Sequence, residues 1–359
     1  MIKPFYPKML PLNLNDGDLL KLYKKALEAN KKLTEFSVLL ERNFISDRLM
    51  CLFALNESVQ STRIEGTQAT FSSVIEAQAS EKYDKDTKEV LNYLEALNMG
   101  TELLKSLPIS TRLILKLHEI ILKDGRGRDR DPGAYRKTQN WIGPTSKIED
   151  ATYIPPSADK LVDYISNLEK YINDEIADDI DPLIKIAVIH AQFESIHPFL
   201  DGNGRVGRVL IMLYLLDKKV ISKPTFFVSE ELERNKFKYY TMLNNLRNEE
   251  PRWKEWIEFF LDAIIKQANK NIEKLRQIEK LFNEMKEFAN ENSIKMEFIE
   301  AIFSTPIFTI KKIEKTLNVS YTASKNNILK LCKSGKVFSD DKKRNKLFFF
   351  TDLIDILGN

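Results

Sequence analysis

The sequence predicts a mainly all-α protein with one β-hairpin-like segment and a separate small module at its C-terminal end. Apolar residues recur every three or four positions through most of residues 17–289, which is the pattern of amphipathic and buried helices. Residues 133–156 depart from this pattern because they combine turn residues with short strand-like runs. After residue 291 we expect three short helices followed by a hairpin.

The helical periodicity is interrupted by short breaks that separate one expected helix from the next. Asp181-Pro182 is one predicted helix start, because proline is well placed in a first turn. The helix after Gly204 is apolar nearly all round, which predicts a buried central helix. The expected helices are 17–42, 45–64, 86–105, 110–123, 158–175, 182–195, 204–218, 229–247 and 252–289.

The length of 359 residues and the hydrophobic content of 43% allow two or three domains with a sizeable core. The pattern divides the chain into an N-terminal helical region at 1–110 and a central core at 111–262. A charged helical connector is expected at 263–291 and a C-terminal module at 292–359. The sequence therefore predicts several helical units rather than one uniform domain.

The composition also predicts where the protein works. No run of about 18 apolar residues is present, so we expect neither a transmembrane helix nor a membrane partner. The first residues lack the apolar core of a signal peptide. Cys51 and Cys332 lie far apart in the sequence, which favours a reduced, cytoplasmic protein over a disulfide framework.

The most informative segment is residues 197–208, which read HPFLDGNGRVGR between two apolar helical runs. The helix after this loop is expected to begin near Asn203 or Gly204. A glycine-rich loop at a helix N-terminus directs unpaired N–H groups and the positive end of the helix dipole at the same point. The segment therefore predicts an anion site, suited to a phosphate chain.

The charged residues of this segment add chemistry to the anion site. Asp201 is a hard oxygen ligand that could hold Mg²⁺ against phosphate oxygens. Arg205 and Arg208 are three residues apart on a helix, so both can face one anion. His197 can take up a proton near neutral pH. Together these residues predict phosphoryl or nucleotidyl transfer, with His197 as the base that deprotonates a hydroxyl.

The whole segment resembles the signature of the Fic family (the Fic/Doc fold), and every specified position matches. The preceding residues 189–196 are similar to the family's lead-in. The resemblance implies a Fic-type helical bundle that transfers AMP from ATP to a hydroxyl of a target protein, with Mg²⁺. The Doc-type branch phosphorylates instead and departs from the Gly-Asn-Gly-Arg run, which is intact here. The implied roles are base for His197, metal ligand for Asp201, α/β-phosphate binding for Gly202, Asn203, Gly204 and Arg205, and γ-phosphate binding for Arg208.

A second motif lies at residues 61–66, at the end of the helix-like segment 45–66. Gly66 is a plausible helix stop. The hexapeptide resembles the inhibitory motif of the Fic family, with Ser61, Glu65 and Gly66 at its specified positions. This resemblance implies that Glu65 pairs with Arg208 and denies it to the γ-phosphate. In some family members the same glutamate supports removal of AMP, so a de-AMPylase remains an alternative.

The turn-rich segment 133–156 resembles the β-hairpin flap of the family, which registers a target segment by strand addition. Thr138, Trp141 and Ile142 are its candidate target-contacting residues. A plain surface hairpin is the alternative. The resemblance also makes Tyr240 and Leu243 candidate walls of the adenine pocket, although an aromatic stripe at helical spacing equally predicts core.

Residues 294–359 resemble a winged helix-turn-helix and hold 12 lysine and arginine residues against 7 aspartate and glutamate residues, a net charge of +5. Lys325, Lys330, Lys333 and a basic wing tip at 340–345 could contact DNA phosphates. Winged helices also serve as protein-docking or dimerisation modules, so DNA and a protein partner remain open. A DNA-binding regulator whose Fic region senses nucleotide is thus a second functional hypothesis. Self-modification and a homodimer also remain open.

Overall fold

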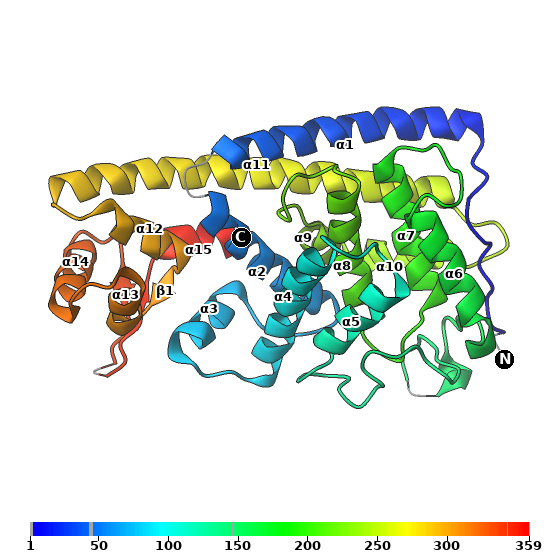
Figure 1. Ribbon diagram of the computed structural model, residues 1–359, viewed down its shortest axis with the longest axis horizontal. Coiled ribbons are helices and arrows are strands. Elements are labelled where there is room, and N and C mark those ends of the chain that lie inside the picture. The colour runs from blue at the N-terminus through cyan, green and yellow to red at the C-terminus, as the bar shows by residue number, and fades with distance from the viewer. Residues whose placement is uncertain (1–2, 43–45, 146, 343, 359) are drawn as a thin grey trace.

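Figure 1 shows the computed structural model of the chain, which describes residues 3–42, 46–145, 147–342 and 344–358. Parts of three predicted features lie outside the described residues: the first residue of the expected helix 45–64, residue 146 of the segment 133–156 and Lys343 of the expected wing tip. The fold is mainly helical, as predicted, and its strands are confined to short segments.

Two long helices lie side by side along one side of the molecule (Figure 1). They are α1 (Asp16–Arg42) and α11 (Trp253–Glu291). The inward face of α1 carries apolar residues at helical spacing, including Leu22, Ala26 and Leu33, and these are buried. The boundary expected after residue 262 falls inside α11, so the connector continues the last helix of the core without a break.

The centre of the fold is formed by α7 (Pro182–Ile196) and α8 (Asn203–Asp217). Almost every residue of both helices is buried, as the continuous apolar runs predicted. The Asp181 side chain caps α7 by accepting a hydrogen bond from the Leu183 N–H at 2.8 Å. The Trp256 indole of α11 donates to the Ala187 carbonyl at 2.8 Å. These contacts fix α7, the helix that leads into the 197–202 loop.

Shorter helices surround this central pair. The prediction of a single helix at 229–247 is wrong, because the helix is interrupted at Asn235. The two parts are α9 (Ser229–Arg234) and α10 (Lys236–Asn244). A further helix, α3 (Phe71–Ser80), was not predicted from the sequence. The remaining helices are α2 (Ser46–Ile64), α4 (Lys85–Leu103), α5 (Thr111–Ile121) and α6 (Leu161–Ile172).

The predicted hairpin region contains only a minimal β interaction among its described residues. Ile142 and Tyr153 form an isolated antiparallel bridge, in which the Ile142 N–H donates to the Tyr153 carbonyl at 2.8 Å. The intervening chain includes a short 3₁₀ turn at Ile148–Asp150, and a second, Ala158–Lys160, leads into α6. The flap is therefore a wide loop closed by one bridge.

The C-terminal module has three helices and a small antiparallel sheet, followed by a last helix. The sheet has the order β1-β3-β2, with Ile307 and Phe338 both opposite Phe349. The expected hairpin corresponds to β2 and β3, whereas β1 and the last helix were not predicted. The elements are α12 (Met296–Ser304), β1 (Ile307–Phe308), α13 (Ile310–Leu317), α14 (Tyr321–Lys333), β2 (Phe338–Ser339), β3 (Phe348–Phe349) and α15 (Thr351–Gly358).

The module packs against the segment that carries the inhibitory motif. Arg48 of α2 pairs with Glu300 of α12 at 2.6 Å. The backbone of Gly358 in α15 lies against the Phe71 ring of α3. Figure 1 shows α12 and α15 next to α2 and α3. None of the helices in the described part of the chain is long and apolar enough to cross a membrane. Cys51 and Cys332 are both free thiols.

Candidate functional site

The 197–202 loop is held by side chains that bind its backbone. The Asn203 amide accepts a hydrogen bond from the Phe199 N–H at 2.8 Å and donates to the Phe199 carbonyl at 2.9 Å. Asn140 also donates to the Phe199 carbonyl, and Arg136 donates from Nε to the His197 carbonyl at 2.9 Å. Gly202, with φ of 82°, provides the left-handed turn that starts α8. The side chain of Asn203 is thus occupied by the loop, so its part in phosphate binding would fall to its backbone.

His197 ends α7 in a left-handed conformation, with φ of 49°, and is half-buried. Its Nδ1 lies 3.3 Å from the Glu194 carbonyl oxygen, which only an N–H can satisfy. The other ring nitrogen, Nε2, therefore carries the lone pair. Burial, followed by the nearby Arg247 guanidinium, lowers the pKa of His197 below its ordinary value. The imidazole is consequently neutral at physiological pH and able to accept a proton.

Arg205 is almost fully buried, and not all of its N–H donors are paired. Its Nη2 donates to Oδ1 of Asp201 at 3.0 Å. Its Nε and Nη1 have no hydrogen-bond partner among the described residues. Buried guanidinium N–H groups are costly when they are unpaired. Arg205 is therefore prepared to bind an anion at the N-terminal end of α8.

Arg208, one turn further along α8, is satisfied by the inhibitory motif. Its Nε donates to Ser61 Oγ at 2.7 Å, and its Nη2 donates to the Ser61 carbonyl at 3.0 Å and to Glu65 Oε1 at 2.7 Å. Burial acts to raise the pKa of Glu65, but the guanidinium of Arg208 brings it below its ordinary value. The ion pair predicted between Glu65 and Arg208 is present, and both members carry their charge.

The Glu65 carboxylate also reaches the start of α8. A Cβ added at Gly204 would lie 2.4 Å from Glu65 Oε1, so the carboxylate rests directly against that backbone. A negative charge at this point is stabilised by the helix dipole. Glu65 thus lies at the predicted anion site itself, as well as on Arg208.

The residues that hold the inhibitory motif from the other side were not predicted from the sequence. Arg126 Nη1 donates to the Glu65 carbonyl at 3.0 Å, and the Arg126 N–H donates to Glu89 Oε1 at 2.8 Å. The second oxygen of Glu89 accepts from Thr67 Oγ1 at 3.0 Å. No local pattern marks Arg126 or Glu89, because their contacts join segments far apart in the chain.

Two buried acids were also missed. Glu57, on α2, accepts hydrogen bonds from Tyr93 OH and from the Ser229 N–H and hydroxyl. Glu194, on α7, has one carboxyl oxygen without a partner among the described residues. Burial raises the pKa of each to about 7, against the lowering effect of Arg208 on both. The surroundings of Arg208 therefore contain one ionised carboxylate, Glu65, and two carboxyl groups that titrate near neutral pH.

The predicted metal ligand, Asp201, is the one carboxylate in residues 197–208. Its side chain is 26% exposed, and Oδ1 accepts from the Gly202 N–H at 2.6 Å as well as from Arg205. Its Oδ2 lies 4.0 Å from Arg126 Nε. The described residues contain no group of three or more His, Cys, Asp or Glu side chains arranged around one metal position. A single carboxylate of this kind fits Mg²⁺, which takes one or two carboxylates and completes its shell with water and phosphate oxygens.

The predicted base-pocket and flap residues differ in how exposed they are. Tyr240 is 38% exposed and its hydroxyl donates to the Ile64 carbonyl at 3.2 Å, at the end of the inhibitory helix. Leu243 is 3% exposed and belongs to the core, so it lines no open surface. In the flap, Thr138 is exposed while Trp141 and Ile142 are half-buried. Arg136 ties the flap to the site, because it also donates to the Thr138 carbonyl at 3.3 Å.

The fold and the site define a class of mainly helical proteins in which a loop between two buried helices carries a histidine beside an anion site. Comparison with known proteins identifies the family. Residues 108–215 match the Fic/DOC family and residues 23–102 match the Fic/DOC family N-terminal region, together more than half of the chain. The chain therefore belongs to the Fic/DOC family.

Among curated proteins, the chain is similar to several that carry the name "Protein adenylyltransferase Fic", two of which are from Drosophila grimshawi and Drosophila virilis. The one from Drosophila grimshawi is 29% identical over 166 residues, which is 44% of this chain and 32% of the relative. The one from Drosophila virilis is 25% identical over 232 residues, which is 62% of this chain and 44% of the relative. The chain thus spans less than half the length of these curated relatives.

Solved structures support the fold. A Fic family protein from Desulfovibrio desulfuricans superposes with a TM-score of 0.59 at 19% identity, covering 97% of this chain and 98% of that one. A fragment of Fic-1 from C. elegans superposes with a TM-score of 0.53 at 21% identity, covering 73% of this chain and 74% of that one. The Desulfovibrio match extends over nearly the whole chain, including the C-terminal module.

Proposed function

We propose that this protein is a protein adenylyltransferase, which transfers AMP from ATP to a hydroxyl side chain of a target protein and is held inactive by Glu65. The observation that carries the proposal is the neutral His197 imidazole, held beside an anion site in which Arg205 has unpaired N–H groups. The name of the Drosophila relatives supports transfer of an adenylyl group.

The chemistry assigned to His197 is the removal of one proton. The target hydroxyl oxygen forms a bond to the α-phosphorus of ATP, the bond from that phosphorus to the bridging oxygen breaks, and pyrophosphate leaves. The hydroxyl proton passes to Nε2 of His197, because Nδ1 already donates toward the Glu194 carbonyl. The flap, tied to His197 through Arg136, would hold the target chain by its backbone.

Charge neutralisation falls to the start of α8. The backbone N–H groups of the first turn of α8, which starts at Asn203, and the free guanidinium donors of Arg205 would bind the phosphates. Asp201 would hold Mg²⁺, which supplies positive charge to the phosphate oxygens when it is bound. The Asn203 side chain contributes by holding the loop in the shape that presents these groups.

The brake follows from competition for the same groups. Glu65 lies against Gly204 and pairs with Arg208, so its carboxylate excludes a phosphate from both. An ATP molecule that bound while Glu65 stayed in place would lack the contact to Arg208. Removal of Glu65 should release Arg208 for the γ-phosphate and align the α-phosphorus for attack.

The proposal is tested with ATP labelled at the α-phosphorus and Mg²⁺, using the wild type, Glu65→Gly and the double variant Glu65→Gly/His197→Ala. Incorporation of label into protein and release of pyrophosphate are both measured. We expect strong signals from Glu65→Gly alone. Equal signals from the double variant would show that His197 is not the base. A Glu65→Gly signal no higher than that of the wild type would show that Glu65 does not inhibit the reaction.

A further inference from the structure

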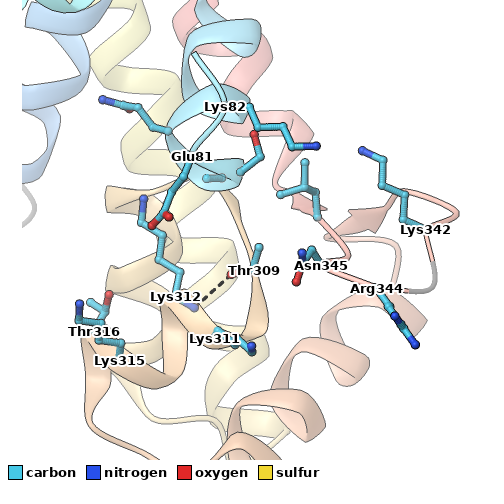
Figure 2. A pocket seen from close by; sticks show the side chains of 14 residues that line it. Glu81, Lys82, Thr309, Lys311, Lys312, Lys315, Thr316, Lys342, Arg344 and Asn345 are labelled. Carbon is cyan, nitrogen blue, oxygen red and sulfur yellow. Dashed lines mark hydrogen bonds between the residues drawn. The ribbon is translucent and has the colours of Figure 1, made fainter.

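A basic groove lies between α3 and the C-terminal module, away from the 197–208 loop. We define it by Lys82, Lys311, Lys312, Lys315, Lys342 and Arg344, and it encloses about 720 Å³. Figure 2 shows that these side chains come from three places: the end of α3, helix α13 and the β2–β3 connection. Two segments far apart in the sequence thus build one positively charged hollow.

Most of the cations in the basic groove form no ion pair with a described residue. Lys342 pairs with Asp340 at 3.3 Å. Among the described residues, no carboxylate lies within 4.0 Å of the other five cationic side chains. Glu81 is the acidic residue in the lining, and Lys312 is half-buried beside it. The six cations outnumber these two carboxylates, so they repel one another, and this repulsion is relieved when an anion binds.

The lining favours a polymer backbone over a small ligand. A site for a small molecule fixes its ligand with a few precisely placed, mostly buried polar groups. Here Lys82, Lys311, Lys315 and Arg344 are long, exposed side chains spread across the hollow. Thr309, Thr316 and Asn345 add hydroxyl and amide groups at its surface. Such an arrangement suits repeated, evenly spaced negative charges, which is what a phosphodiester chain presents.

The other surfaces of the C-terminal module favour nucleic acid over an acidic protein. Helix α14 exposes a polar face that includes Thr322, Lys325 and Asn326, the residue types that hydrogen-bond base edges. It is the third helix of a module whose hairpin supplies Lys342 and Arg344. A helix and an adjoining hairpin tip that both present donors match the way in which winged modules contact a duplex.

We propose that the basic groove binds the phosphate backbone of duplex DNA, with α3 and the C-terminal module contributing cations jointly. This binding is independent of the AMP transfer proposed above and does not require it. Helix α3 begins at Phe71, shortly after the inhibitory motif ends at Gly66. DNA in the groove would therefore contact both the C-terminal module and the segment that follows the brake.

The test is fluorescence anisotropy of a labelled duplex with the full-length protein over a range of KCl concentrations. We compare wild type with Lys311→Ala/Lys315→Ala and with Lys82→Ala. The matched control is Lys21→Ala/Lys24→Ala, which removes two exposed lysines from the start of α1, at the other end of the molecule (Figure 1). All four lysines of the double variants are exposed, so circular dichroism should show unchanged helix content.

We expect Lys311→Ala/Lys315→Ala to weaken binding about tenfold at low salt and to lower the slope of log Kd against log salt by about 0.9 for each phosphate that is no longer neutralised. Lys82→Ala should lower the slope by about half as much, and the control should leave it unchanged. Equal effects of the groove variants and the control would overturn the proposal. Displacement of DNA by tripolyphosphate, at an ionic strength at which KCl does not displace it, would also overturn the proposal in favour of a small polyphosphate. Binding of polyglutamate as tight as that of DNA would overturn it in favour of an acidic protein.

Discussion

The Glu65 carboxylate accepts a hydrogen bond from Arg208 Nη2 at 2.7 Å while it rests against the backbone of Gly204. One side chain, from the residue directly after α2, therefore meets two features that attract anions on α8, the guanidinium and the helix N-terminus. Ser61 binds the same guanidinium from one turn earlier, so the proposed brake is a short segment at the end of α2 that offers Arg208 several acceptors.

This arrangement predicts that Ser61→Ala partly releases the brake. The variant removes the acceptor of Arg208 Nε but leaves Glu65 in place, at a cost of about 1–3 kcal/mol to the inhibited arrangement. We expect labelling from ATP to rise several-fold, but less than in Glu65→Gly. Ser58→Ala is the matched control, since Ser58 is equally buried on α2 and its hydroxyl donates to the Ala54 carbonyl rather than binding Arg208. Equal labelling of the two serine variants would exclude a role for the Ser61 hydroxyl.

Arg126 provides a second prediction, which concerns the metal. Its guanidinium lies 4.0 Å from Asp201 and its positive charge opposes a cation at that carboxylate. We expect Arg126→Ala, placed in the Glu65→Gly background, to lower the Mg²⁺ concentration for half-maximal labelling by about two- to five-fold at low salt. Arg128→Ala is the control, because Arg128 is exposed in the same loop and pairs only with Asp129. A Mg²⁺ requirement unchanged by Arg126→Ala would argue against Asp201 as the metal ligand.

Asn203 provides a third prediction, which separates two roles for one residue. Its amide makes two hydrogen bonds to Phe199, and both groups are buried. Asn203→Ala should lower the free energy of unfolding by about 2–4 kcal/mol even without nucleotide, because the Phe199 N–H loses its partner. Chemical denaturation measures the loss, with the exposed Asn98→Ala of α4 as control. An unchanged stability without nucleotide would instead assign the Asn203 side chain to ligand binding alone.

The parts of this site that could be predicted from sequence are those encoded in local segments. His197, Asp201, Arg205 and Arg208 lie within one helix–loop–helix unit, so their spacing alone brings them together. The pairing of Arg208 with Glu65 joins distant segments, and it was predicted from the resemblance of the inhibitory motif rather than from any spacing.

The parts that were missed depend on tertiary contacts without a local pattern. Arg126 and Glu89 meet the inhibitory motif only after α4 and the following loop have packed. Helix α3 has only ten residues and rests on a capping box between Thr70 and Ser73, which a periodicity over longer windows does not detect. The break at Asn235 is equally invisible, since the apolar spacing continues across it.

The fourth prediction concerns the pH dependence of stability. Burial raises the pKa of Glu194 to about 7, from the ordinary value of 4.5. The folded protein therefore keeps this proton between pH 4.5 and about 7, whereas the unfolded chain has lost it. Because the folded state binds more protons in this window, the contribution of Glu194 to the free energy of unfolding falls as pH rises and is constant above about 7.

Glu194→Gln keeps the shape and the neutral state of the side chain, so it should remove this decline. The pKa values of His118, His190 and His197 are lowered and act in the opposite direction. The prediction therefore concerns the difference in the free energy of unfolding between variant and wild type, in which the histidines cancel. We expect the free energy of unfolding of Glu194→Gln, relative to that of the wild type, to rise by up to about 3 kcal/mol between pH 4.5 and 7.5. Urea denaturation measures it.

Glu57→Gln is the comparison, because burial also raises the pKa of Glu57 to about 7 but three hydrogen bonds satisfy its carboxyl group. It should change the pH dependence in the same window while lowering stability at every pH, since its network is disturbed. Glu194→Gln should lower the free energy of unfolding little at low pH, because one carboxyl oxygen of Glu194 has no partner among the described residues. A difference between Glu194→Gln and wild type that stays constant across the window would show that Glu194 is ionised throughout, and that Arg208 is then shared between two carboxylates.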